Sequence, residues 1–157
     1  MKFLIKKEYI FLLGFLSLYL SYYFGENSSG GAYLDSKTTL IFLKSFDNGL
    51  LPGLEWFILN DQIHLPFFYY IKSILLRFIP DNLVNIFYLF LSSLIPLVLY
   101  KCLRLKFSDC DQKYIFSLSL LLYFSPYFRS SAAWFTADNL ATLFFFNFNL
   151  LLFTFYS

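Results

Sequence analysis

The chain has 157 residues, of which 59% are hydrophobic, 24% aromatic and only 14% charged, with a formal net charge of +2. A mean hydropathy of +0.61 lies outside the usual range of soluble globular domains, so the composition predicts an integral membrane protein. The apolar runs are continuous rather than alternating, which excludes an outer-membrane barrel and favours helical spans. The small net charge does not indicate a nucleic-acid partner, because basic residues near span ends mostly set orientation.

The first apolar run covers residues 9–24 and follows a short basic head with Lys2, Lys6 and Lys7. A signal peptide has the same outline, but no small-residue cleavage pattern follows this run. The run ends instead in three aromatic residues, which are typical of the membrane interface. We therefore expect a retained span with a cytoplasmic N-terminus.

A loop at 25–64 separates this run from the next one and carries five carboxylates and the only histidine. Glycine and short polar residues favour a flexible entry, and a helix is expected to begin near Asp35. Its spacing indicates a helix lying in the membrane interface, ended by residues 49–53. The expected apolar face holds Leu40, Leu43, Phe46 and Leu50, and the polar face holds Lys37, Lys44 and Asn48. A second amphipathic piece is expected at 54–59.

Four further apolar segments are expected to be helical, near 66–79, 83–100, 114–128 and 132–156. Pro66 suits the first turn of a helix, and Pro80 ends the same helix. Together with the first run, these segments predict an all-α integral membrane fold in one domain. We expect four to five transmembrane helices, with interfacial amphipathic helices in the first extracytoplasmic loop.

Two topologies remain open for the middle of the chain. If 66–79 and 83–100 both span, the basic residues within 101–113 lie outside, against the positive-inside rule. If 66–79 only dips into the membrane, those basic residues lie inside, and Asp138 emerges on the same side as Asp35. Either topology gives a multi-pass protein, expected in a bacterial inner (cell) membrane.

Two residues of the loop are candidates for chemistry. Asp35 is either a helix cap, worth roughly 1 kcal/mol, or a general base placed to meet a lipid-linked substrate at the membrane surface. His64 is either an ordinary interfacial histidine or, beside the helix start at Pro66, a contact for a phosphate or an acceptor hydroxyl.

Three later residues are also candidates. Lys72 lies in an apolar segment, where an ionisable group faces the bundle interior or snorkels toward the interface. Arg129 and Asp138 flank a polar interruption between two apolar runs. This interruption is either a connecting loop followed by a helix cap, or a site where the guanidinium of Arg129 binds a phosphate.

The order of these features resembles the N-terminal part of the GT-C glycosyltransferases. The similar parts are a first span, the loop aspartate Asp35, the stretch 64–70, the stretch 125–129 and Asp138. The superfamily includes protein O-mannosyltransferases, aminoarabinose transferases and dolichyl-phosphate-glucose-dependent glucosyltransferases. The resemblance implies an enzyme that transfers a hexose or pentose from a polyprenyl-phosphate carrier to an acceptor at the extracytoplasmic membrane face.

The resemblance also implies a role for Asp35, which occupies the place of the base that deprotonates the acceptor in an inverting displacement. The other candidates, His64, Lys72, Arg129 and Asp138, are expected to bind substrate. Family members usually carry a second acidic residue next to the first. Here Ser36 follows Asp35, so a divalent metal is not supported and no cofactor is expected.

The length departs from the family, whose members have many more spans. We therefore expect the N-terminal portion of a larger enzyme, whose partners are a lipid-linked sugar donor, membrane lipids, and the missing C-terminal half or another subunit. The alternative is a small non-catalytic multi-span protein, or a fragment, that packs with a partner subunit. A transporter component is disfavoured, since no span carries paired acidic residues at its middle.

Overall fold

The computed structural model describes residues 7–25, 32–60 and 66–156, without the side chains of 7–8, 32–36 and 156. Within these ranges the chain forms helices and turns and no strand, which confirms the all-α class. The elements are α1 (Lys7–Tyr23), α2 (Ala32–Ser45), α3 (Leu50–Leu59), α4 (Pro66–Phe78), α5 (Asp81–Lys106), α6 (Gln112–Leu120), the 3-10 helix η1 (Leu121–Phe124), α7 (Pro126–Trp134) and α8 (Ala137–Tyr156).

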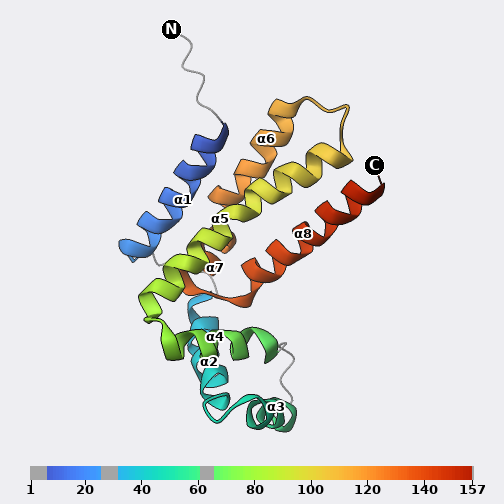
Figure 1. Cartoon of the computed structure of the whole chain (residues 1–157). Coiled ribbons are helices and arrows are strands. Elements are labelled where there is room, and N and C mark those ends of the chain that lie inside the picture. Colours follow the sequence, from blue (N-terminus) through green and yellow to red (C-terminus); the bar gives the residue numbers. More distant parts are fainter. Residues whose placement is uncertain (1–6, 26–31, 61–65, 157) are drawn as a thin grey trace.

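The helix at the centre of the bundle is α5, which packs against α1, α6, α7 and α8. Figure 1 shows α1, α5, α6 and α8 running side by side. Apolar side chains from several of these helices fill the space between them. The buried members of this core are Phe11, Leu18, Leu89, Ile95, Tyr100, Ile115, Tyr123, Phe128, Ala132 and Leu143.

Two of the described helices are long and apolar enough to cross a membrane, namely Asp81–Lys106 and Ala137–Phe155. At 1.5 Å per residue, α5 is roughly 39 Å long and α8 roughly 30 Å, against a hydrocarbon core of about 30 Å. On α8, the side chains of Phe144, Phe148 and Phe155 are largely exposed. An apolar surface of this kind suits contact with lipid. The expected count of four to five spans remains a prediction.

At the end of the bundle where α5 begins, α2, α3 and α4 form a separate group (Figure 1). They are joined by a second apolar cluster of Phe42, Leu43, Phe46, Phe57 and Tyr69. Gly53 lies so close to the ring of Phe46 that a Cβ at this position would overlap it. The three helices therefore pack against one another through their own, mostly aromatic, side chains.

The start of α3 corrects the expected break at residues 49–53. The helix begins at Leu50 and includes Pro52 and Gly53, because a proline in the first turn lacks only an N–H that needs no helical partner. The expected faces of the preceding helix are confirmed in part. Leu43 and Phe46 are buried and the three polar residues are exposed, as expected. Leu40 was expected on the apolar face but is 59% exposed, whereas Thr39 is buried.

The helix α4 has 13 residues, which makes it roughly 20 Å long. Figure 1 shows it lying across the end of α5 rather than alongside it. A short connection at Ile79 and Pro80 joins the two helices, and the side chain of Pro80 gives no cap to α5. The segment 66–79 is thus a transverse helix.

The last two expected segments also have different limits. The segment 114–128 is divided at Ser125, whose Oγ accepts a hydrogen bond from the backbone N–H of Phe128 and caps α7. Phe135 follows α7 with a positive φ of 52°, which ends that helix. The last long helix therefore begins at Ala137, not at residue 132.

Gly14 allows α1 to approach Tyr123 closely, since a Cβ there would overlap the tyrosine ring. The hydroxyl of Tyr123 donates a hydrogen bond to the carbonyl of Ser93 at 2.8 Å and has the carbonyl of Phe11 3.4 Å away as an alternative acceptor, so the ring has little room to move. We expect Gly14→Ala to lower the free energy of unfolding by about 1–3 kcal/mol through overpacking. The check is thermal unfolding in detergent followed by circular dichroism. Leu13→Ala, on the exposed face of α1, is the control and should have little effect. An unchanged unfolding temperature for Gly14→Ala would rule out the close approach.

Candidate functional site

The structure describes the side chains of three of the five residues assigned to a site: Lys72, Arg129 and Asp138. His64 lies outside the described residues. Asp35 lies near the start of α2, and its side chain is not among those described. The proposed roles of His64 and Asp35 thus remain predictions.

The helices that carry candidate residues are linked by a chain of contacts. The helix α2, which contains the backbone of Asp35, packs against both α4 and α7, and α7 packs against α8. Figure 1 shows α7 where the long bundle meets the α2–α4 group. Elements distant in sequence therefore converge at one end of the bundle.

Lys72 faces the protein interior and is only 7% exposed. Its Nζ donates a hydrogen bond of 3.4 Å to the carbonyl of Phe135 and lies 4.0 Å from the centroid of the same residue's ring. The ring of Phe135 also packs against Tyr88 of α5 and Phe68 of α4, with centroids 4.0 and 5.6 Å away. One residue between α7 and α8 thus receives contacts from α4 and α5.

Burial lowers the pKa of Lys72 to about 8, while the negative charge of Asp81 opposes this change. The amine is therefore mostly protonated at pH 7. A carbonyl oxygen and the face of an aromatic ring both stabilise such a cation. The geometry therefore supports a Lys72 side chain that faces the protein interior and does not snorkel toward the interface.

Arg129 of α7 is held by groups from two other elements. Its guanidinium donates hydrogen bonds to the hydroxyls of Ser17, at 2.7 Å, and of Ser21, both on α1, and to the carbonyl of Tyr123, at 3.3 Å. The polar interruption that contains Arg129 is consequently a helix packed on α1, not a connecting loop. Part of the guanidinium's hydrogen-bonding capacity is already used within the protein.

Asp138 lies in the first turn of α8 and is exposed. Its Oδ2 accepts a hydrogen bond of 2.8 Å from the hydroxyl of Thr136, whose carbonyl accepts one from the hydroxyl of Tyr88. Next to it, the buried amide of Asn139 donates to the carbonyl of Phe128 at 3.1 Å. A carboxylate in the first turn stabilises a helix dipole, so Asp138 has a clear structural role beside any role toward substrate.

Sequence reasoning did not assign a function to two charged residues that the structure brings to one cavity. Arg77 donates hydrogen bonds to the carbonyls of Phe46 at 2.7 Å and Asp47 at 2.8 Å, at the C-terminal end of α2. Asp81 begins α5 and accepts a hydrogen bond of 3.3 Å from Asn85. The signal in the sequence was the pair of opposite charges on either side of the Pro80 break.

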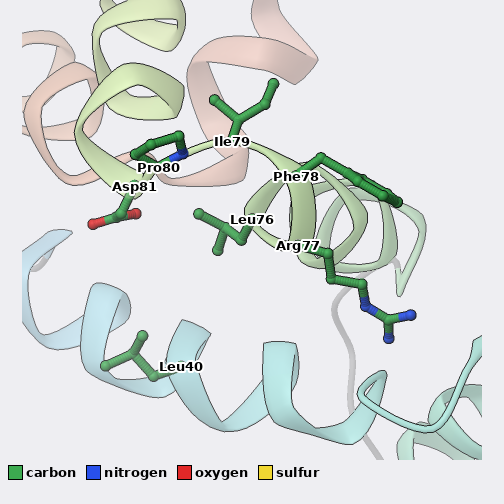
Figure 2. A pocket seen from close by; sticks show the side chains of 7 residues that line it. All are labelled: Leu40, Leu76, Arg77, Phe78, Ile79, Pro80 and Asp81. Carbon is green, nitrogen blue, oxygen red and sulfur yellow. The ribbon is translucent and has the colours of Figure 1, made fainter.

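The cavity has a volume of about 490 Å³ and is open to the outside. It lies between α2 and the connection of α4 to α5, as Figure 2 shows. Its lining consists of Leu40, Leu76, Arg77, Phe78, Ile79, Pro80 and Asp81. Separately, the ranges 7–25, 32–60 and 66–156 contain no group of three or more His, Cys, Asp or Glu side chains arranged to hold a metal ion.

The lowered pKa of Lys72 predicts a dependence of stability on pH. Between about pH 8 and 10.5 the unfolded chain binds more protons at this amine than the folded one, so the free energy of unfolding rises with pH. We expect a gain of about 2–3 kcal/mol between pH 7 and pH 10. Lys72→Met should lose this gain.

Chemical unfolding in detergent at the two pH values, followed by circular dichroism, measures the effect. Lys101→Met removes an exposed lysine of α5 and should keep the gain. Equal responses of wild type and Lys72→Met would show that the amine is not buried in this way.

No protein-family model, no curated protein and no solved structure matches this chain. Similarity therefore assigns it to no family, and its function is inferred from its residues and their geometry.

Proposed function

We propose that the protein is a multi-pass membrane protein that forms the N-terminal portion of a glycosyltransferase with a polyprenyl-phosphate-sugar donor. One observation carries the proposal. The helix α2, with Asp35 near its start, packs against α4 and α7, the helices that carry the cations Lys72 and Arg129. A base for the acceptor and cations for a phosphate are the two requirements of this transfer.

In the proposed reaction, Asp35 takes the proton of the acceptor as the acceptor attacks the anomeric carbon of the sugar. The bond between that carbon and the phosphate oxygen breaks, and the polyprenyl phosphate leaves with the electron pair. Lys72 and Arg129 stabilise the negative charge of the leaving phosphate. His64 and Asp138 contact hydroxyls of the sugar or the acceptor.

In the membrane placement that we propose, α1, α5 and α8 span, the stretch formed by α6, η1 and α7 returns the chain across the membrane between α5 and α8, and α4 lies at the interface. The length of α4, roughly 20 Å, falls short of the hydrocarbon core of about 30 Å, and its transverse direction (Figure 1) supports the same placement. A cytoplasmic N-terminus then puts residues 101–113, with their four basic side chains, on the cytoplasmic side, in agreement with the positive-inside rule. Asp35 and Asp138 share the opposite side.

Cysteine labelling tests this placement. Cys110 is exposed between α5 and α6, and Cys102 is buried. In a Cys102→Ser background, we expect Cys110 to resist a membrane-impermeant maleimide in intact cells and to react after permeabilisation. Asn60→Cys, placed in a chain without other cysteines, marks the opposite side and should react in intact cells. Labelling of Cys110 from outside would support the other topology, in which 66–79 spans.

Sugar transfer itself is tested by Asp35→Asn, with the gene expressed at its native locus so that any partner subunit is present. Membranes are supplied with a radiolabelled polyprenyl-phosphate sugar, and incorporation into acceptor is counted. Removal of the base is expected to lower transfer at least about 100-fold, with the amount of inserted protein unchanged. The control is Asp109→Asn, an exposed carboxylate at the far end of α5. Undiminished transfer by Asp35→Asn would exclude Asp35 from the mechanism.

A second candidate function is a non-catalytic protein that packs with a partner subunit. The exposed phenylalanine surface of α8 favours it, because a partner helix covers such a surface as well as lipid does. If this candidate is right, a photo-crosslinking residue in place of Phe148 should form a crosslink to a single protein. The same membranes should show no sugar transfer. Crosslinks to lipid alone would count against this candidate.

A further inference from the structure

The helix α8 has a lateral surface that takes no part in the transfer proposed above. Figure 1 shows α8 at the edge of the bundle, beside α5. Within the described part of the protein, 11% of the apolar stretch of α8 is buried, against 44% of that of α5. The surface of α8 that faces away from α5 is therefore open to lipid or to another protein.

Four exposed residues of this surface form a line along α8, which we call the outer stripe: Phe144, Asn147, Leu151 and Thr154. Their alternating spacing of three and four residues is that of the a and d positions of a heptad, which lie on one side of a helix and form the contact between paired helices. Asn149 follows Asn147 by two residues, which turns it roughly 200° around the helix and away from this line. The outer stripe thus has the geometry of a helix-pairing surface.

Asn147 places an amide in the middle of this surface. It lies about ten residues from either end of α8, a distance of roughly 15 Å along the helix on each side. Its Nδ2 donates a hydrogen bond of 2.8 Å to the carbonyl of Leu143, one turn earlier. Within the described ranges its Oδ1 accepts no hydrogen bond, and lipid acyl chains have none to donate. An amide at this depth is therefore stabilised by a partner that supplies a donor.

We propose that α8 pairs with α8 of a second copy of this chain along the outer stripe, with the two Asn147 side chains hydrogen-bonded to each other. An amide has both a donor and an acceptor, so it is complementary to itself. Copies inserted in the same orientation hold equivalent residues at the same depth, so a two-fold axis along the membrane normal brings the two amides together. One asparagine in such a contact also fixes the register of the pair. The proposal rests on the membrane placement given above and not on sugar transfer.

Energy transfer between labelled copies of the full chain tests the pairing. In a Cys102→Ser background, Cys110 carries a donor dye in one sample and an acceptor dye in another, and the two are reconstituted together into phosphatidylcholine vesicles. We expect energy transfer that saturates as the protein-to-lipid ratio rises. Asn147→Leu should move the midpoint to a roughly tenfold higher ratio, because it removes the hydrogen bonds between the copies. The matched control Asn149→Leu removes an amide that also bonds to its own helix, at the carbonyl of Phe145, and should leave the midpoint unchanged.

Cysteine crosslinking in native membranes locates the contact. In a chain without other cysteines, Phe144→Cys and Leu151→Cys should form dimers of the chain on oxidation. Phe146→Cys, at a position packed against the bundle core, should not. Absence of energy transfer, an unchanged midpoint for Asn147→Leu, or crosslinks from the outer stripe to a different protein would each overturn the proposal. Neither measurement depends on sugar transfer, so failure of that hypothesis leaves both results unchanged.

Discussion

The contact of the Lys72 amine with Phe135 is the buried polar link between the α2–α4 group and the turn from α7 to α8. Phe135 holds a left-handed backbone conformation, which costs a residue with a side chain roughly 1–2 kcal/mol. The surrounding contacts stabilise it, because the carbonyl accepts a hydrogen bond from Lys72 and the ring packs on Tyr88. This one residue ends α7, directs the chain into α8 and receives the transverse α4. Without it, the group of α2, α3 and α4 would lose its polar attachment to the turn between α7 and α8.

Other buried or half-buried polar side chains also link neighbouring elements. Tyr123 and Arg129 both donate to groups of neighbouring elements, so the hydroxyl of Tyr123 and the guanidinium of Arg129 are satisfied by protein groups within an apolar bundle. Polar side chains therefore determine which helices are neighbours, while the phenylalanine and leucine side chains fill the volume between them. This division explains why candidates for chemistry and residues needed for folding are partly the same residues.

Helical class and approximate segments could be predicted from the sequence because continuous apolar runs and prolines act locally. The start of α3 could not, since Pro52 is compatible with a break and with a first turn alike. The boundary at Phe135 could not either, because a phenylalanine gives no local signal for a left-handed conformation. For the site, the sequence left open whether Lys72 is buried or snorkels toward the interface. The structure shows it buried, and its hydrogen-bond partner Phe135 lies 63 positions away in the sequence. The sequence did not show that Arg77 and Asp81 line one cavity, because this cavity forms only where α2 packs beside them.

The attachment of Arg77 has a mechanical consequence for α2. It fixes the last turn of this helix to α4, while Asp35 lies toward the opposite end. A helix of 14 residues is a lever of roughly 21 Å, so a rotation of about 5° at its anchored end moves the other end by about 2 Å. A tilt of α4 would therefore shift the backbone of Asp35, which lies on a different helix.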